Sequence, residues 1–232
     1  MAGVITHMAV AREISKCLPE GVIGDLGLFY LGNLAPDAIH AREDYKREYK
    51  KHTHFRDGIR DEDFAKEENI ALFYSRVSDF IRKSREQKDG LLDLYRGYVS
   101  HVLTDELFIL TIREKFCRSM EKLGIVQRDP RFFEYIVTDM TRNDFLLVRD
   151  YEGSDEIRKY MEQVRIYPVE GYLSAQEMLT CRNWLVKQHY YEERELLEPI
   201  YISYEETLQF IRMAAEDIVK RLSEDKIFPR MF

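Results

Sequence analysis

The sequence is poor in cysteine, glycine and proline, and each shortage argues against a class of protein. Its three cysteines, Cys17, Cys117 and Cys181, lie far apart and form no Cys-x-x-Cys pair. This pattern argues against a disulfide framework or a zinc knuckle and favours reduced, buried thiols. Only 11 glycines and 6 prolines occur in 232 residues. Strand-like alternation bounded by turn residues is almost absent, so a β-rich fold is disfavoured.

Long apolar runs are also missing. No segment reaches the roughly 18 consecutive apolar residues that a membrane span needs. The beginning, MAGVITHMAVAREISK, lacks the charged start and continuous apolar core of a signal peptide. We therefore expect a cytoplasmic protein without a transmembrane segment. The net charge of −7 disfavours nonspecific binding to nucleic acid or to anionic membranes, although a local basic patch is compatible with it.

What is present is helical periodicity over most of the chain. Apolar residues make up 45% and charged residues 33% of a chain long enough for one sizeable core. The sequence predicts an all-α, multi-helical single domain over 1–232, in which 1–119 carries the candidate site and 120–232 completes the core and supplies a pocket wall. The predicted helices cover residues 4–17, 67–85, 89–119, 130–148, 173–197 and 203–223, with a short buried helix inside 21–38.

The segment 40–60 has a different composition, because apolar residues nearly vanish and basic ones accumulate. We expect an exposed, partly mobile segment. Two interpretations stay open: a solvated charged loop, or a surface that orients an anionic phosphoester. The basic residues are Arg42, Lys46, Arg47, Lys50, Lys51, Arg56 and Arg60.

His101 and Asp105 give the strongest site signal. In the helix predicted over 89–119 they share one face with apolar and aromatic residues such as Tyr98 and Phe108. Burying a carboxylate without compensation costs several kcal/mol, so Asp105 needs a partner. That partner is a metal ion, a His–Asp hydrogen bond, or an arginine from another helix.

Three further residues are candidates for the same site. Of His52 and His54 in KHTHF, we favour His54 because Phe55 follows it and can anchor it to the core. Asp37 follows a proline in LAPDA, where an Asx turn or a helix N-cap is the common alternative. His7 lies among apolar residues, where a hydrogen-bonded core histidine is the common alternative.

The order of these residues resembles the zinc-dependent phospholipase C family, which shares its fold with zinc-type single-strand nucleases. That family has an N-terminal His, an Asp after a short apolar stretch, a His, and then a helical His-x-x-x-Asp. The corresponding residues here are His7, Asp37, His54, His101 and Asp105, in the motifs GNLAPDA, THF and YVSHVLTDELF. The resemblance covers roughly the first 115 residues.

The resemblance implies a metal-dependent phosphoric ester hydrolase. Zinc or another divalent transition metal, as one or two ions, would be held by these five residues. Asp37, His54, His101 and Asp105 would enclose one ion, and Asp105 would bridge to a second ion held by His7. Asp37 and Asp105 are the candidate catalytic carboxylates, and a metal-activated water would attack a small anionic phosphoester.

The chain departs from this family in two respects. Secreted members begin at a processed tryptophan whose amine binds metal, and they carry a second helical His-x-x-x-carboxylate soon after the first. Here the nearest equivalent is the distant pair His189 and Glu193, so whether that pair or His52 takes part is left open.

Other functions remain as alternatives. A phosphohydrolase of the HD superfamily would need adjacent His-Asp residues, and this chain has no such dipeptide. A non-catalytic helical binding protein with a structural or vestigial metal site is the main alternative. We further expect Trp184 in the core, and Asp139 and Asp144 as exposed acids or caps rather than pocket residues. The apolar tail 227–232 would suit a dimer contact, so a homo-oligomer is compatible with the sequence.

Overall fold

Helices form nearly all the regular structure in residues 2–87 and 89–223, the part of the chain that the computed structural model describes. The predicted all-α fold is confirmed: these residues contain no β-strand, only one isolated bridge between Val169 and Leu173. The α-helices are α1 (Val4–Cys17), α2 (Leu26–Leu34), α3 (Arg47–Thr53), α4 (Glu67–Gln87), α5 (Leu92–Phe108), α6 (Glu114–Lys122), α7 (Pro130–Asp150), α8 (Ser154–Gln163), α9 (Ala175–Leu185) and α10 (Tyr204–Ser223).

Short helical turns of other types join several of these helices. Ala35–Ala41 (η1) and Asp61–Asp63 (η2) are 3-10 helices, and Ile109–Arg113 (η3) and Val186–Tyr191 (η4) are π-helices. Helical structure therefore continues without a gap through most of the predicted segment 89–119, with the π-turn η3 between α5 and α6. Periodicity alone does not reveal such a turn.

Some helix predictions were wrong in extent. The helix predicted to reach residue 197 continues from α9 through η4 but ends at Tyr191, and from there the described chain is non-helical until α10. Helix α8 was not predicted, because it is only ten residues long, is mostly polar and charged, and carries its helical spacing on just three apolar residues, Ile157, Tyr160 and Met161.

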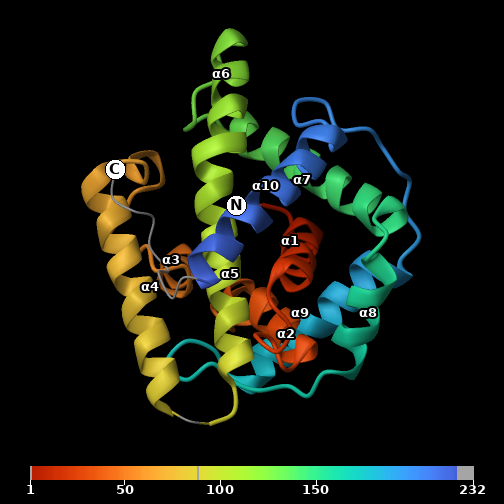
Figure 1. Cartoon of the computed structure of the whole chain (residues 1–232). Helices are drawn as coiled ribbons and strands as arrows, with labels where there is room; N and C mark the ends of the chain where they lie inside the picture. The colour runs from red at the N-terminus through yellow and green to blue at the C-terminus, as the bar shows by residue number, and fades with distance from the viewer. Residues whose placement is uncertain (1, 88, 224–232) are drawn as a thin grey trace.

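Helix α5 runs through the middle of the molecule (Figure 1), with α4 along one side and α7 and α8 on the other. Helix α2 packs along α5, and α1 packs between α2 and α10. Helix α6 continues the direction of α5 beyond η3 and projects from the body. In the described part of the chain, no helix combines the length and apolar character required to cross a membrane.

Two glycines let the backbones of α2 and α5 approach closely. A Cβ on Gly32 would lie 1.9 Å from the Leu94 carbonyl oxygen, and a Cβ on Gly97 would lie 2.0 Å from the Phe29 carbonyl oxygen. No side chain fits at either position without moving a helix. Because Asn33 follows Gly32 and His101 lies one turn after Gly97, this contact also sets the distance between those two residues.

The segment 40–60 was wrongly expected to be exposed throughout. Its second half forms α3 and buries Lys50, His54, Phe55 and Arg56. Phe55 adopts a left-handed conformation with φ of 57°, which costs about 1–2 kcal/mol in a non-glycine residue. Its ring packs against those of Phe80, Tyr98 and Tyr172, and this contact offsets the cost. The arrangement fixes the chain direction directly after His54.

Three further expectations are corrected. Trp184 is 48% exposed rather than in the core, because it lies on the side of α9 that borders a cavity. Asp139 and Asp144 are buried rather than exposed, and Asp144 lines a cavity contrary to expectation. Asp139 accepts hydrogen bonds from the amides of the chain before α10, and Asp144 accepts them from Thr6. The tail 227–232 lies outside the described residues.

We expect Gly97→Ala to destabilise the protein by about 1–3 kcal/mol, the usual cost of overpacking, because the new methyl group meets the Phe29 carbonyl. Urea denaturation measures the free energy of unfolding. Gly24→Ala is the matched control, since its Cβ would meet only Asp93 Oδ2 at an ordinary 3.6 Å. Equal stability of the two variants would contradict the close approach of α2 and α5.

Candidate metal centre

The structure brings all five candidate ligands together from four parts of the chain. His7 comes from α1, Asp37 from η1, His54 from the residue that ends α3, and His101 and Asp105 from α5. They form two overlapping groups with metal-ligand spacing, namely His7, His101 and Asp105, and Asp37, His54 and His101. Within each group, the potential ligand atoms all lie within 4.8 Å of one another.

Asp105 faces both groups. Its Oδ1 lies 3.2 Å from His7 Nε2, and its Oδ2 lies 3.5 Å from His54 Nε2. His101 belongs to both groups, but an imidazole nitrogen binds only one ion whereas a carboxylate can bridge two. Asp105 is therefore the residue whose chemistry allows a shared ligand between two ions.

The histidine tautomers follow from the backbone around them. Nδ1 of His54 lies 2.9 Å from the Lys50 carbonyl oxygen, and Nδ1 of His101 lies 2.6 Å from that of Asn33. A carbonyl only accepts hydrogen bonds, so each Nδ1 carries the hydrogen. In the neutral rings both Nε2 atoms then carry lone pairs, and they face each other at 3.3 Å. Such a pair repels unless a cation or a proton lies between them.

Burial keeps these rings neutral. It lowers the pKa of His54 to about 4, and the Lys50 ammonium works in the same direction, although Asp37 partly opposes it. Burial and the neighbouring His7 place the pKa of His101 well below its usual value. A metal cation therefore suits the two facing nitrogens better than a proton does.

The carboxylates stay ionised although burial alone would raise their pKa. The Lys50 ammonium and the His54 and His101 rings hold the pKa of Asp37 well below its usual range. The pKa of Asp105 is likewise held well below its usual range against the effect of burial, with His7 Nε2 beside its Oδ1 at 3.2 Å. Two anionic carboxylates beside neutral imidazoles form a donor set suited to zinc and related divalent ions.

His7 does not behave as a hydrogen-bonded core histidine. It is fully buried, and neither ring nitrogen has a hydrogen-bond partner of acceptable geometry among the described residues. Its ring stacks on that of His101 with centroids 3.8 Å apart and planes 4° apart. A buried imidazole without a partner is costly, and a bound metal would satisfy it.

Lys50 connects the cluster to the surface and was not foreseen as part of it. Its ammonium donates to Asp37 Oδ1 at 2.6 Å and to His40 Nε2 at 3.0 Å. The side chain is 8% exposed, and such burial of a lysine is rare without a paired charge. Asp37 itself is neither an Asx turn nor an N-cap, because its carboxylate faces Lys50, His54 and His101.

A second layer of hydrogen bonds positions the ligands. The Tyr98 hydroxyl donates to the Thr53 carbonyl at 2.5 Å, and the Thr53 hydroxyl donates to the Pro36 carbonyl at 2.9 Å. These bonds tie α5, the end of α3 and η1 together beside His54 and Asp37. No spacing rule in the sequence signals them, since each joins elements distant in the chain.

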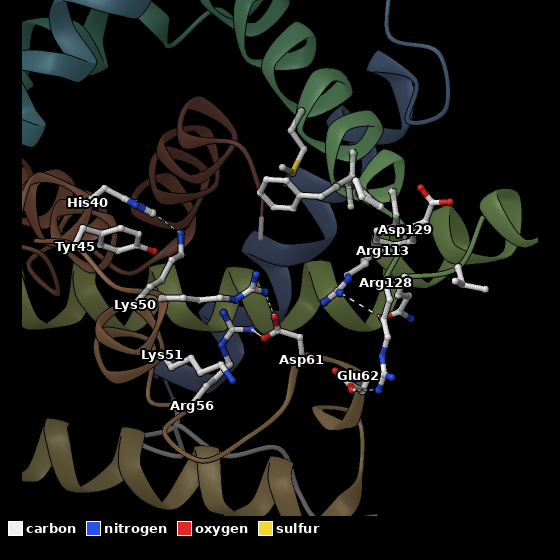
Figure 2. Close-up of a pocket in the computed structure, with 18 residues that line it drawn as sticks. His40, Tyr45, Lys50, Lys51, Arg56, Asp61, Glu62, Arg113, Arg128 and Asp129 are labelled. Carbon is white, nitrogen blue, oxygen red and sulfur yellow. Dashed lines mark hydrogen bonds and ion pairs between the residues drawn. The ribbon is translucent and has the colours of Figure 1, made fainter.

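Two cavities adjoin the cluster and share His40 and Met140 in their linings. The basic pocket, of about 940 Å³, is lined by Arg47, Lys50, Lys51, Arg56, Arg113 and Arg128 together with three acidic and several apolar residues. Figure 2 shows it between the segment from His40 to Glu62 and the residues around Arg113 and Arg128. The second pocket, of about 630 Å³, reaches the cluster at Asp37.

The remaining sequence candidates lie elsewhere. His52 is exposed, pairs with Asp57 and stacks on Tyr172. His189 is buried against Phe145 in the wall of the second pocket. Glu193 is exposed beyond the end of η4, so it no longer lies one helical turn from His189. Neither His189 nor Glu193 belongs to a potential metal group of the described residues.

Comparison with protein-family models, with curated proteins and with solved structures finds no match.

Asp144, in the second pocket, gives a prediction on pH. Burial raises its pKa to about 6, although hydrogen bonds from Thr6 and Ile5 oppose this. The folded state therefore holds a proton that the unfolded state releases near pH 4, and the free energy of unfolding falls as pH rises from about 4 to 6. The full effect is about 3 kcal/mol. We expect Asp144→Asn to remove this part of the pH dependence.

Urea denaturation between pH 4 and 7, with a chelator present, measures that difference. Asp150→Asn on the same helix is the control, since Asp150 is exposed and paired with Arg149. Identical pH dependence in the Asp144 variant and the parent would refute the assignment.

Proposed function

We propose that this protein is a metal-dependent hydrolase of phosphoesters, of the kind that its resemblance to the zinc-dependent phospholipase C family implies. Its cofactor is zinc or another divalent transition metal, as one or two ions. The ligands are His7, Asp37, His54, His101 and Asp105.

One observation carries the metal assignment. The Nε2 atoms of His54 and His101 face each other at 3.3 Å with both Nδ1 atoms bound to carbonyl oxygens. Asp105 Oδ2 lies 3.5 Å from His54 Nε2 and completes a set of lone pairs directed at one region. Converging lone pairs in a buried site need a cation, and the low pKa values of the rings argue against a proton in that role.

The residues divide the work as follows. A bound metal would supply an activated water and would stabilise charge on a phosphoryl oxygen. His54 and His101 hold their Nε2 lone pairs toward the centre, because backbone carbonyls fix their tautomers. Asp105 spans both groups of ligands. Asp37 is the ligand that reaches the second pocket and, with Asp105, is the candidate catalytic carboxylate.

The surroundings support a small anionic phosphoester as the substrate. Lys50 contacts Asp37 and also lines the basic pocket, so positive charge extends from the cluster to the cavity. The three cysteines are free thiols, which agrees with the cytoplasmic location included in this proposal. A homo-oligomer stays a prediction.

Burial of the ligands favours a second candidate, a helical binding protein with a structural metal. His7, His54, His101 and Asp105 are each at most 3% exposed, as is typical of closed structural sites. The partly exposed Asp37, which lines the second pocket, favours the hydrolase.

Metal analysis of matched variants tests the proposal. We expect about one to two equivalents of transition metal in protein purified without a histidine tag, as for a mono- or dinuclear centre. His54→Ala and Asp105→Ala should lose most of it, and phosphoester hydrolysis should fall roughly 100-fold or more. His52→Ala is the control, because it removes an exposed histidine two residues from His54. Equal metal content in the His52, His54 and Asp105 variants would exclude this centre.

Chelation separates the two candidates. A catalytic metal predicts lost turnover with a modest decrease in melting temperature, and readdition of metal should restore activity. A structural metal predicts cooperative unfolding when the ion is removed. Thermal denaturation of the parent with and without chelator, alongside the activity assay, is the measurement.

A further inference from the structure

The basic pocket has an excess of positive charge that its own carboxylates do not balance. Six cationic side chains line it against the three acidic ones of Asp61, Glu62 and Asp129. Asp129 is bound by Arg131 and Lys50 is bound by Asp37, and neither of these partners is part of the lining, so five cations remain against Asp61 and Glu62. In Figure 2, Lys50, Lys51 and Arg56 lie across the cavity from Arg113 and Arg128. An anion between these two sides would contact both.

Arg56 is the residue that most needs such an anion. It is 7% exposed, and its Nε is buried without a hydrogen-bond partner among the described residues. Its nearest carboxylate is Asp61, with Nη1 and Oδ1 3.8 Å apart, beyond hydrogen-bonding distance. Asp61 is itself hydrogen-bonded to Arg47. One carboxylate thus serves two guanidinium groups. Arg56 also lies over the Phe64 ring, 5.7 Å from its centroid, but a buried guanidinium that shares its nearest carboxylate is still unfavourable.

Lys51 and Arg113 add further positive charge among the described residues, and Arg113 helps to lower the pKa of Asp61, a carboxylate that Arg56 and Arg47 already share. Neither Lys51 nor Arg113 forms an ion pair in the described part of the chain; Arg113 donates only to the Gln127 side-chain oxygen at 3.4 Å and lies over the Phe132 ring. Lys51 and Arg56 come from α3 and the loop after it, and Arg113 comes from the π-turn η3. Guanidinium and ammonium groups from separate elements that converge on one cavity suit phosphate oxygens.

The shape of the pocket indicates a small molecule. Its volume of about 940 Å³ is at the upper end of the range for ligand sites, and Phe132, Phe133, Ile136 and Met140 form an apolar wall on α7. The protein carries a net charge of −7, which disfavours a long polyanion such as nucleic acid. A compact organic molecule with several phosphates fits both properties.

Lys50 connects this pocket to the proposed metal centre. It lines the pocket, and its ammonium lies 2.6 Å from Asp37 Oδ1. We propose that the basic pocket binds a second phosphate group of the substrate, so that the phosphoester hydrolysed at the metal centre belongs to a small bisphosphate or polyphosphate. The identification of the bound molecule as a substrate rests on the proposed hydrolase function. Binding of phosphate groups in the basic pocket can be tested separately.

Calorimetric titration of the full chain after treatment with a chelator tests anion binding by the basic pocket in the absence of metal at the proposed centre. We expect inorganic pyrophosphate to bind at least about tenfold more tightly than inorganic phosphate, since it can reach cations on both sides. Arg56→Gln and Lys51→Gln should each weaken pyrophosphate binding about tenfold. Arg60→Gln is the matched control, because Arg60 lies in the same segment but is exposed and outside the lining.

Three results would overturn the inference. These are equal affinity for phosphate and pyrophosphate, equal loss in the Arg60 and Arg56 variants, or tighter binding of a single-stranded oligonucleotide than of pyrophosphate. Lys51 is only partly buried, so Lys51→Gln keeps the test decisive if Arg56→Gln fails to fold.

Turnover with metal added links the pocket to catalysis. Fructose 1,6-bisphosphate should be hydrolysed with a kcat/KM at least about tenfold above that of fructose 6-phosphate, and Arg56→Gln should reduce this ratio toward one. Equal rates for the two sugars would count against the inference. If neither is hydrolysed while pyrophosphate still binds through Arg56, the proposed function fails and the phosphate pocket stands.

Discussion

The close approach of α2 and α5 is the contact on which the candidate centre depends. Gly32 and Gly97 remove the Cβ atoms that would separate the two backbones. This proximity lets the Asn33 carbonyl accept a hydrogen bond from His101 Nδ1 at 2.6 Å. That bond fixes the His101 tautomer and leaves Nε2 with a lone pair that can bind a metal. The helix that carries His101 and Asp105 is thus positioned by its partner helix before any ligand contributes.

The cluster also buries negative charge, and Lys50, which reaches the basic pocket, compensates part of it. Asp37 and Asp105 are buried anions beside neutral imidazoles, an arrangement that is unfavourable without a nearby cation. Lys50 supplies one on the Asp37 side, through a 2.6 Å contact. Its burial draws α3 against η1, and the same helix presents Arg47 and Lys51 to the basic pocket. Neutralising one candidate ligand therefore also assembles the basic side of the pocket that is proposed to bind an anion.

Periodicity predicted most of the helices, because one-sided burial leaves a 3.6-residue pattern. Helix α5 is buried on all sides from Gly97 to Phe108, so the face predicted from the sequence is only part of its buried surface. Leu94, Tyr98, His101 and Asp105 are all buried there. Periodicity failed to predict the burial of side chains whose exposure depends on tertiary contacts. Burial of Lys50 depends on Asp37, thirteen residues away, and exposure of Trp184 depends on a cavity formed with α7. The five candidate ligands could be chosen from the sequence, but the carbonyls and hydroxyls that orient them come from elements distant in the chain.

The division of the chain suggests how chemistry and selectivity would be separated in the proposed hydrolase. All five candidate ligands come from residues 7–105, whereas α7, α9 and η4 form the walls of the cavities opposite the residues that this part of the chain contributes. Ligand geometry depends on α1, α2 and α5, which pack on one another in the core. The cavity walls include exposed side chains such as Phe133 and Trp184, whose replacement disturbs little packing. Pocket shape can therefore change without moving a ligand, and Asp37 and Lys50, where the cavities meet the cluster, are the residues that couple the two.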